Sequence, residues 1–177
     1  APHEPGQNPR GDEQRVAGRA IDRPGFDTSA TGGIMNRAIR QQTIDDYIRK
    51  DPFAAHLGAK VEIPEPGHSR VSLTITEEMT NFHGMTHGGV IFALSDIAFA
   101  AASNSHGQVA VALNVGITFL KATGSGDRLV AEAREAHAGG RTALYEIAVR
   151  YEKTGELVAK SQNLVYRKNE WFVPEEG

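Results

Sequence analysis

A nearly uninterrupted apolar run from Val90 to Ala102 constrains the fold of this 177-residue chain more than any other feature. As an α-helix at 1.5 Å per residue, the run would be about 20 Å long, short of the roughly 30 Å of hydrocarbon in a membrane. A helix that is apolar on nearly every face must be enclosed by other elements of the protein. We therefore expect a core helix and no membrane span.

Short stretches with strand character lie on both sides of this helix in the sequence. Val71, Leu73 and Ile75 alternate with polar residues, and this period of two indicates a strand with one buried face. The other stretches of this kind are residues 60–63, 109–120, 128–136, 142–152 and 157–166. An antiparallel sheet of five or six strands curled around the apolar helix accounts for both patterns. The expected fold class is α+β.

The chain before this region has a different composition. Residues 1–33 interleave Pro, Gly, Arg and acidic residues without a helical or strand period, and we expect a disordered tail there. Residues 34–52 are expected to form an N-terminal helix, because apolar residues recur at roughly helical spacing and Pro52 ends the pattern. Residues 53–170 are expected to form the main domain.

Composition disfavours several classes of function. The chain has no cysteine, which rules out disulfides, thiolate metal ligands and a cysteine nucleophile. Its formal net charge of -3 gives no general attraction to nucleic acid or to anionic membranes. The first residues lack the apolar stretch of a secretory leader, so we expect a cytoplasmic protein.

Asp96 interrupts the apolar run and is the strongest candidate for chemistry. Its neighbours Leu94, Ile97 and Phe99 predict a largely apolar environment, in which a charged carboxylate is costly. Desolvation raises the pKa of a carboxyl group and makes it a better general base. The alternative is a helix residue that faces a polar cavity or caps a neighbouring segment.

The glycine-rich segment NFHGMTHGG, residues 81–89, leads directly into the predicted helix. The backbone N–H groups of Gly88 and Gly89 are candidate free donors at the positive end of the helix dipole, where they can stabilise an oxyanion. An ordinary turn is the alternative. Gly88 precedes Asp96 by eight residues, or about 12 Å of helix. If both act on one substrate, they must come from two subunits of a two-fold dimer with antiparallel central helices.

Further polar residues are weaker candidates. His83 and His87 are four residues apart, but the segment between them is loop-like and lacks a carboxylate, which disfavours a metal site. His87 is more consistent with orienting the loop or a substrate. Asn81 can hydrogen-bond a carbonyl or a water, or it can fix the turn. Lys121 and Arg141 are candidates for pairing with phosphate, with solvated surface charge as the alternative.

The segment NFHGMTHGGVIFALSDIAFA, residues 81–100, resembles the signature of the PaaI-type acyl-CoA thioesterases, which have the hotdog fold. The resemblance extends over residues 45–168. It implies that Asp96 activates water at the thioester carbonyl or attacks it directly, and that Gly88 N–H polarises this carbonyl. It also implies supporting roles for Asn81 and His87, a site at a dimer interface, a homotetramer of two such dimers, and no cofactor.

The leading hypothesis is hydrolysis of an acyl- or aryl-CoA thioester, with phenylacetyl-CoA and its ring-hydroxylated relatives as first candidates because of the resemblance. One alternative is a hotdog hydratase or dehydratase of enoyl thioesters, for which Asp96 and His87 can supply an acid-base pair. The other is a non-catalytic acyl-CoA binding module, which predicts affinity without turnover. Release of the thiol from a thioester discriminates the first reading from both alternatives.

Overall fold

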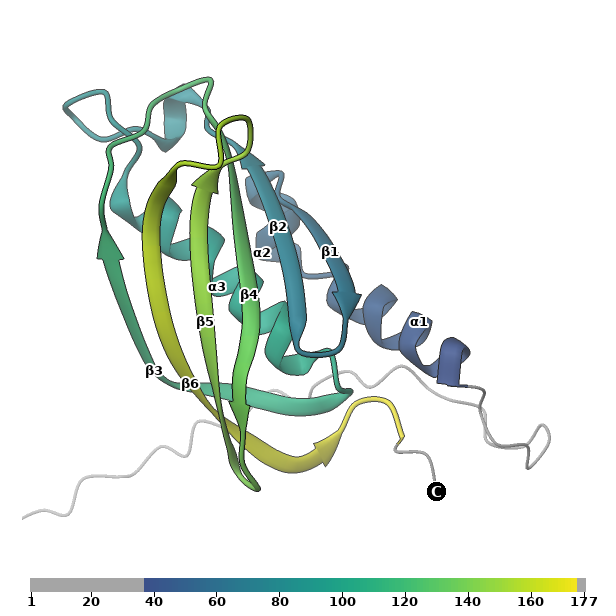
Figure 1. Ribbon diagram of the computed structural model, residues 1–177. Helices are drawn as coiled ribbons and strands as arrows, with labels where there is room; N and C mark the ends of the chain where they lie inside the picture. Colours follow the sequence, from purple (N-terminus) through teal and green to yellow (C-terminus); the bar gives the residue numbers. More distant parts are fainter. Residues whose placement is uncertain (1–36, 175–177) are drawn as a thin grey trace, which may run out of the picture. The chain divides into compact units, whose positions relative to one another are not determined.

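The computed structural model describes residues 37–174, so the predicted disordered tail at residues 1–33 lies outside the described part of the chain (Figure 1). The elements in chain order are α1 (Arg37–Ile48), α2 (Pro52–Leu57), β1 (Lys60–Glu65), β2 (His68–Thr74), the 3₁₀ turn η1 (Glu77–Met79), α3 (Gly88–Asn104), β3 (Gln108–Phe119), β4 (Arg128–Ala138), β5 (Thr142–Tyr151) and β6 (Leu157–Trp171).

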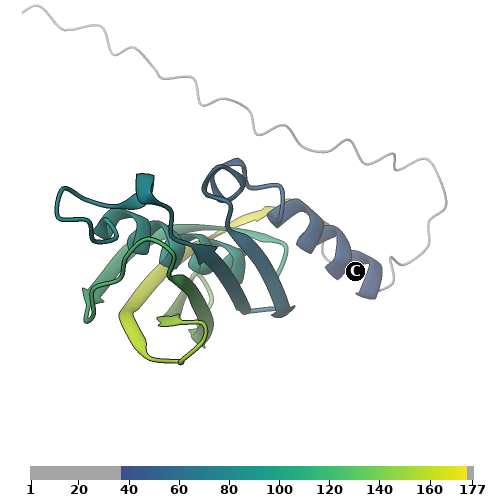
Figure 2. The same ribbon diagram turned by 90° about the horizontal axis from the view of Figure 1, so that it is seen from above.

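One six-stranded sheet has the order β1-β2-β4-β5-β6-β3, and every neighbouring pair is antiparallel. α3 lies along one face of this curved sheet, as Figures 1 and 2 show. This arrangement confirms the expected α+β class and the hotdog architecture. The sheet order leaves the 12-residue strand β3 at one edge, although β3 directly follows α3 in the chain.

α3 forms where the apolar run predicted a core helix, and nine of its 17 residues are buried. Leu94 and Ala98 are fully enclosed, and the ring of Phe99 packs edge-on against Tyr145 with 5.6 Å between ring centroids. Tyr145 belongs to β5, so this contact joins the helix to the middle of the sheet. The sheet therefore encloses the apolar faces that α3 cannot expose to water.

The helical region expected over residues 34–52 is divided in the structure. α1 ends at Ile48, and Pro52 begins the separate helix α2 instead of only ending the first one. The carboxylate of Asp51 accepts hydrogen bonds from the N–H groups of Phe53 (2.8 Å) and Ala54 (3.2 Å), so Asp51 caps α2. Proline is favoured in a first helical turn because its missing N–H has no helical acceptor there. Within residues 37–174, none of the helices has the length and apolarity required to span a bilayer.

Candidate active site

Asp96 lies in the middle of α3 and is partly buried, between the buried residues Ser95 and Ile97. Burial raises the pKa of its carboxyl group above the usual value, and the negative charge of Asp51 raises it further. No described residue forms a hydrogen bond with the Asp96 carboxylate. Asp96 is therefore a desolvated carboxylate that retains its capacity to accept a proton, as a general base requires.

The first turn of α3 assigns different roles to its two glycines. His87 is the N-cap residue, and its Nδ1 accepts a hydrogen bond from the N–H of Gly89 at 2.9 Å. Gly89 N–H is therefore occupied, which corrects the expectation that both glycines offer free donors. Gly88 N–H has no acceptor among the described residues. The free donor at the positive end of the helix dipole is Gly88 N–H alone.

The same contact defines the protonation of the His87 ring. Because Nδ1 accepts a hydrogen bond, the proton of the neutral imidazole is on Nε2. The side chain is exposed, so Nε2–H is available as a donor at the entrance to the helix. His87 thus stabilises the start of α3 and presents a donor there.

The side chain of Asn81 organises the loop before α3. Its Oδ1 accepts hydrogen bonds from the N–H groups of His83 (2.9 Å) and Met85 (3.3 Å), and its own backbone N–H donates to the Met85 carbonyl at 2.7 Å. Of the two roles considered for Asn81, fixing the turn is the one that these contacts show. Its Nδ2 group has no partner among the described residues and remains a candidate donor to a ligand.

The loop is also hydrogen-bonded to the segment between β3 and β4. Thr86 N–H donates to the Thr123 carbonyl at 2.8 Å, and the two threonine hydroxyls are hydrogen-bonded at 2.7 Å in a buried position. The ring of Phe119, at the end of β3, lies next to Gly88, about 3.7 Å from the position that a Cβ would occupy there. The donor of Gly88 is therefore held in a defined position beside an aromatic ring.

Gly88 and Asp96 do not meet within one chain. Both belong to α3, and eight residues separate them by about 12 Å along the helix axis. A thioester carbonyl that accepts a hydrogen bond from Gly88 N–H cannot also lie next to Asp96 of the same helix, because hydrogen bonds are about 3 Å long. If both residues act on one thioester, they must therefore come from two copies of the chain.

Lys121 and Arg141 also lie far apart. Lys121 N–H donates to Val158 O at the start of β6, whereas the Arg141 carbonyl accepts from Arg167 N–H nine residues further along that strand, a separation of about 30 Å. The ammonium group of Lys121 is paired with Glu156. One chain therefore cannot use both side chains on a single phosphate, and Lys121 already has an anionic partner.

β3 presents an apolar edge. Among the described strands it pairs only with β6, and Leu113, Phe119 and Leu120 on or directly after it are 56%, 50% and 55% exposed. The register with β6 shifts between Ala112 and Asn114, so Leu113 lies at a bulge. A long edge strand with exposed apolar residues is a template for pairing with another strand.

The sequence did not indicate the proximity of Asp51 to Asp96, because 45 positions separate them and no spacing rule connects them. The pairing of Phe119 with Gly88 was likewise not predicted. The only signal available was local: Asp followed by Pro is typical of an N-cap and a first helical position, which places Asp51 at a helix start.

Comparisons with known proteins identify the family to which this chain belongs. Residues 83–158, which include the loop, α3 and β3, match the thioesterase superfamily. The acyl-coenzyme A thioesterase PaaI of Escherichia coli is 40% identical over 99 residues, which cover 56% of this chain and 71% of that protein. This chain therefore belongs to the thioesterase superfamily and is a thioester hydrolase with the hotdog fold.

Solved structures identify the group within the superfamily to which the chain belongs. The E. coli PaaI structure superposes with a TM-score of 0.71 at 31% identity, covering 78% of this chain and 99% of that one. A variant of the phenylacetic acid degradation protein PaaI from Thermus thermophilus superposes with a TM-score of 0.63 at 40% identity, covering 67% of this chain and all 100% of the other. Within the superfamily, the chain is a member of the PaaI-type acyl-CoA thioesterases.

Proposed function

We propose that this chain hydrolyses acyl-CoA thioesters and prefers arylacetyl-CoA esters such as phenylacetyl-CoA or hydroxyphenylacetyl-CoA. The observation that carries the proposed chemistry is that α3 provides both a partly buried Asp96 of raised pKa and, at its start, a Gly88 N–H with no acceptor among the described residues. The preference for arylacetyl groups is supported by the E. coli relative, whose structure is described as coming from the phenylacetic acid degradation operon.

In the proposed reaction, Asp96 takes a proton from water while the water oxygen bonds to the thioester carbon. The carbonyl oxygen becomes an oxyanion that accepts a hydrogen bond from Gly88 N–H. The carbon–sulfur bond then breaks as the carbonyl re-forms, and the leaving CoA thiolate takes up the proton that Asp96 holds, which restores the carboxylate. His87 Nε2–H and Asn81 Nδ2–H are the additional donors proposed to orient the substrate or the water. Direct attack by the Asp96 carboxylate, with an anhydride intermediate, is the alternative course at the same residue.

We further propose that each site is shared by two chains. The antiparallel pairing of β3 with its copy in a second protomer would cover Leu113 and Phe119 and would bring two α3 helices together in opposite directions. Asp96 of one chain would then act with Gly88 of the other. Exposed apolar side chains outside β3, such as Phe53 and Phe92, are candidates for the contacts between two dimers in a homotetramer. A cytoplasmic location stays a prediction.

Thiol release from a panel of arylacetyl-, short-chain and long-chain acyl-CoA esters tests the function. The expected result is turnover with the highest kcat/KM for an arylacetyl ester, and a loss of about a hundredfold or more in Asp96→Asn. Turnover with an equal preference for straight-chain esters would contradict the arylacetyl assignment alone. Tight binding of every ester without thiol release would contradict the hydrolase.

A further inference from the structure

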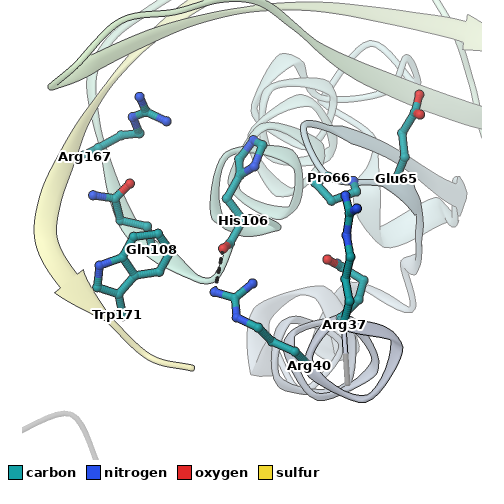
Figure 3. A pocket seen from close by; sticks show the side chains of 9 residues that line it. Arg37, Arg40, Glu65, Pro66, His106, Gln108, Arg167 and Trp171 are labelled. Carbon is teal, nitrogen blue, oxygen red and sulfur yellow. Dashed lines mark hydrogen bonds between the residues drawn. The ribbon is translucent and has the colours of Figure 1, made fainter. Parts of the chain in front are cut away.

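An open pocket of about 640 Å³ lies where α1, the far end of β6 and the turn between α3 and β3 converge (Figure 3). The residues on which the following argument rests are Arg37, Arg40, Glu65, His106, Arg167 and Trp171. Three arginines and a single carboxylate thus line one space, which we call the arginine pocket. This is a local excess of positive charge on a chain whose formal net charge is -3.

Arg40 is held in position from three sides. Its Nε donates to the Pro174 carbonyl at 2.7 Å, and its Nη2 donates to the His106 carbonyl at 3.2 Å, the contact drawn in Figure 3. The guanidinium also lies over the ring of Trp171, 5.6 Å from the ring centroid. These partners are neutral, so they order the guanidinium without cancelling its charge.

Arg167 and Arg37 complete the positive wall. Nη2 of Arg167 donates to the Gly139 carbonyl, and its buried Nε finds no acceptor in the part of the chain that the structure describes. The side chain of Arg37 is exposed and makes no hydrogen bond or ion pair with another described residue. Across residues 37–174, none of the three arginines of the pocket forms an ion pair with a carboxylate.

The central wall of the pocket is fixed by a polar network behind it. His106 Nε2 and the buried Tyr145 hydroxyl both contact the same carboxylate oxygen of Glu135, at 2.9 and 2.6 Å. Burial alone would raise the pKa of Glu135, but the hydrogen bonds from Tyr145 and His106, together with the nearby charges of His106 and Arg167, outweigh it and lower that pKa. Glu135 is therefore ionised and occupied by these donors, which leaves Glu65 as the carboxylate that lines the pocket itself.

We propose that the arginine pocket binds a phosphoryl anion, either a phosphate ester or a diphosphate. Guanidinium groups bind phosphate oxygens through paired N–H donors, and two of the three are already ordered, which lowers the entropic cost of binding. A purely structural role explains Arg40, which links α1 to the C-terminal segment through Pro174. It does not explain Arg37, which contacts no described acceptor.

Two sources can supply such an anion: the nucleotide of a CoA ester, or a separate nucleotide. In the proposed dimer, the start of β3 in one chain lies beside the end of β3 in the other, because the strands are antiparallel. The arginine pocket adjoins the start of β3, whereas Gly88 contacts Phe119 at its end. The pocket of one chain would thus lie toward the Gly88 end of its partner. Only this CoA assignment rests on the proposed function.

Calorimetric titration of the full chain with pyrophosphate and with adenosine 3′,5′-bisphosphate tests the pocket directly. We expect saturable binding that weakens with added salt, because salt screens the attraction between the arginines and the anionic probe. Arg37→Gln, which removes no described contact, should weaken binding roughly fivefold, as expected for one exposed charge pair. Arg49→Gln is the matched control, since Arg49 is an exposed arginine outside the pocket that pairs with Asp45 and Asp46. No saturable binding of either probe, or equal weakening by both variants, would overturn the proposal.

Kinetics then identify the source of the anion. If it is the CoA nucleotide, pyrophosphate competes with the CoA ester, and Arg37→Gln raises KM for that ester with kcat unchanged, while KM for the corresponding pantetheine ester stays the same. If the anion comes from a separate nucleotide, pyrophosphate and the CoA ester bind at the same time. The KM for the CoA ester is then the same in Arg37→Gln as in the native chain. Both results support the pocket. Pyrophosphate binding in a chain that hydrolyses no thioester would remove the proposed function and leave this inference standing.

Discussion

His87 Nδ1 and the N–H of Gly89, two residues apart, form the hydrogen bond that caps α3, and this bond leaves Gly88 N–H as the free donor of the first turn. The arrangement separates two tasks that adjacent glycines would otherwise share. The Gly89 N–H stabilises the helix, and the Gly88 N–H has no acceptor among the described residues. The first two predictions test this separation.

Replacing Gly88 with proline should remove the free donor and keep the helix. Proline is favoured at the first helical position, and His87 has φ -64 and ψ 133, an extended conformation that a residue before proline adopts readily. We expect kcat to fall about a hundredfold to a thousandfold, as for the loss of one oxyanion donor. Gly88→Ala is the matched control, because it adds a Cβ in ordinary contact with Phe119 and retains the N–H. Equal activity of the proline and alanine variants would show that this donor has no catalytic role.

Replacing His87 with alanine should destabilise the protein by about 1 kcal/mol, the usual effect of losing an N-cap acceptor. Asn is a good capping residue, so His87→Asn should restore most of the stability without restoring the Nε2–H donor. Denaturant unfolding and kcat/KM measured on both variants distinguish the two contributions. Recovery of full activity together with stability in His87→Asn would limit His87 to capping.

The raised pKa of Asp96 has two opposite consequences. The proposed reaction needs the deprotonated carboxylate, so kcat/KM should fall as the pH decreases through a pKa above the usual aspartate value. Stability has the reverse dependence: a carboxyl group whose pKa is higher in the folded state than in the unfolded state destabilises the fold once it is ionised. Asp96→Asn should therefore be less active by about a hundredfold and have a higher Tm at neutral pH. A lower Tm in this variant would mean that the carboxylate has a stabilising partner.

Asp51→Asn should shift the acid limb of the kcat/KM profile to lower pH. Asp51 contributes to the raised pKa of Asp96 through its negative charge, although burial contributes more, so the limb should move only part of the way. Asparagine also caps helices well, and α2 should keep its start at Pro52. Asp46→Asn, on α1, is the control. An unchanged profile in Asp51→Asn would show that the two carboxylates are too well screened to interact.

Introducing a charge on β3 tests the shared site. Leu113→Lys should give monomers in analytical ultracentrifugation and should lose activity, because a lysine at the centre of a strand edge opposes pairing with another strand. Ile39→Lys on α1 replaces a residue of similar exposure, 60% against 56%, and should change neither property. Full activity of a monomeric Leu113→Lys variant would rule out a site made from two chains.

The parts of the molecule that could be predicted from sequence are those set by local physics. The central part of α3 followed from the apolar residues 90–102, although the helix is two residues longer at each end. The strand β2 followed from the alternation of Val71, Leu73 and Ile75, the last of which lies one residue beyond it. The start of α2 was missed although Asp51 and Pro52 form a recognisable capping pair. The occupation of Gly89 N–H could not be predicted, because histidine is not among the residues that usually cap helices. The proximity of Asp51 to Asp96 depends on how α2 lies in the fold, which no local pattern contains.

Because Gly88 and Asp96 lie about 12 Å apart on α3, two inactive variants of the proposed enzyme should complement each other in a mixed dimer. Each chain of the dimer would contribute Asp96 to one site and Gly88 to the other. A chain with Asp96→Asn and a chain with Gly88→Pro are therefore defective in different halves of a site. In a mixed dimer, both defects meet in one site, and the other site is assembled from undamaged halves. Two inactive preparations, unfolded and refolded together in equal amounts, should therefore regain about a quarter of the native number of sites, because half of the dimers are mixed and each mixed dimer has one intact site.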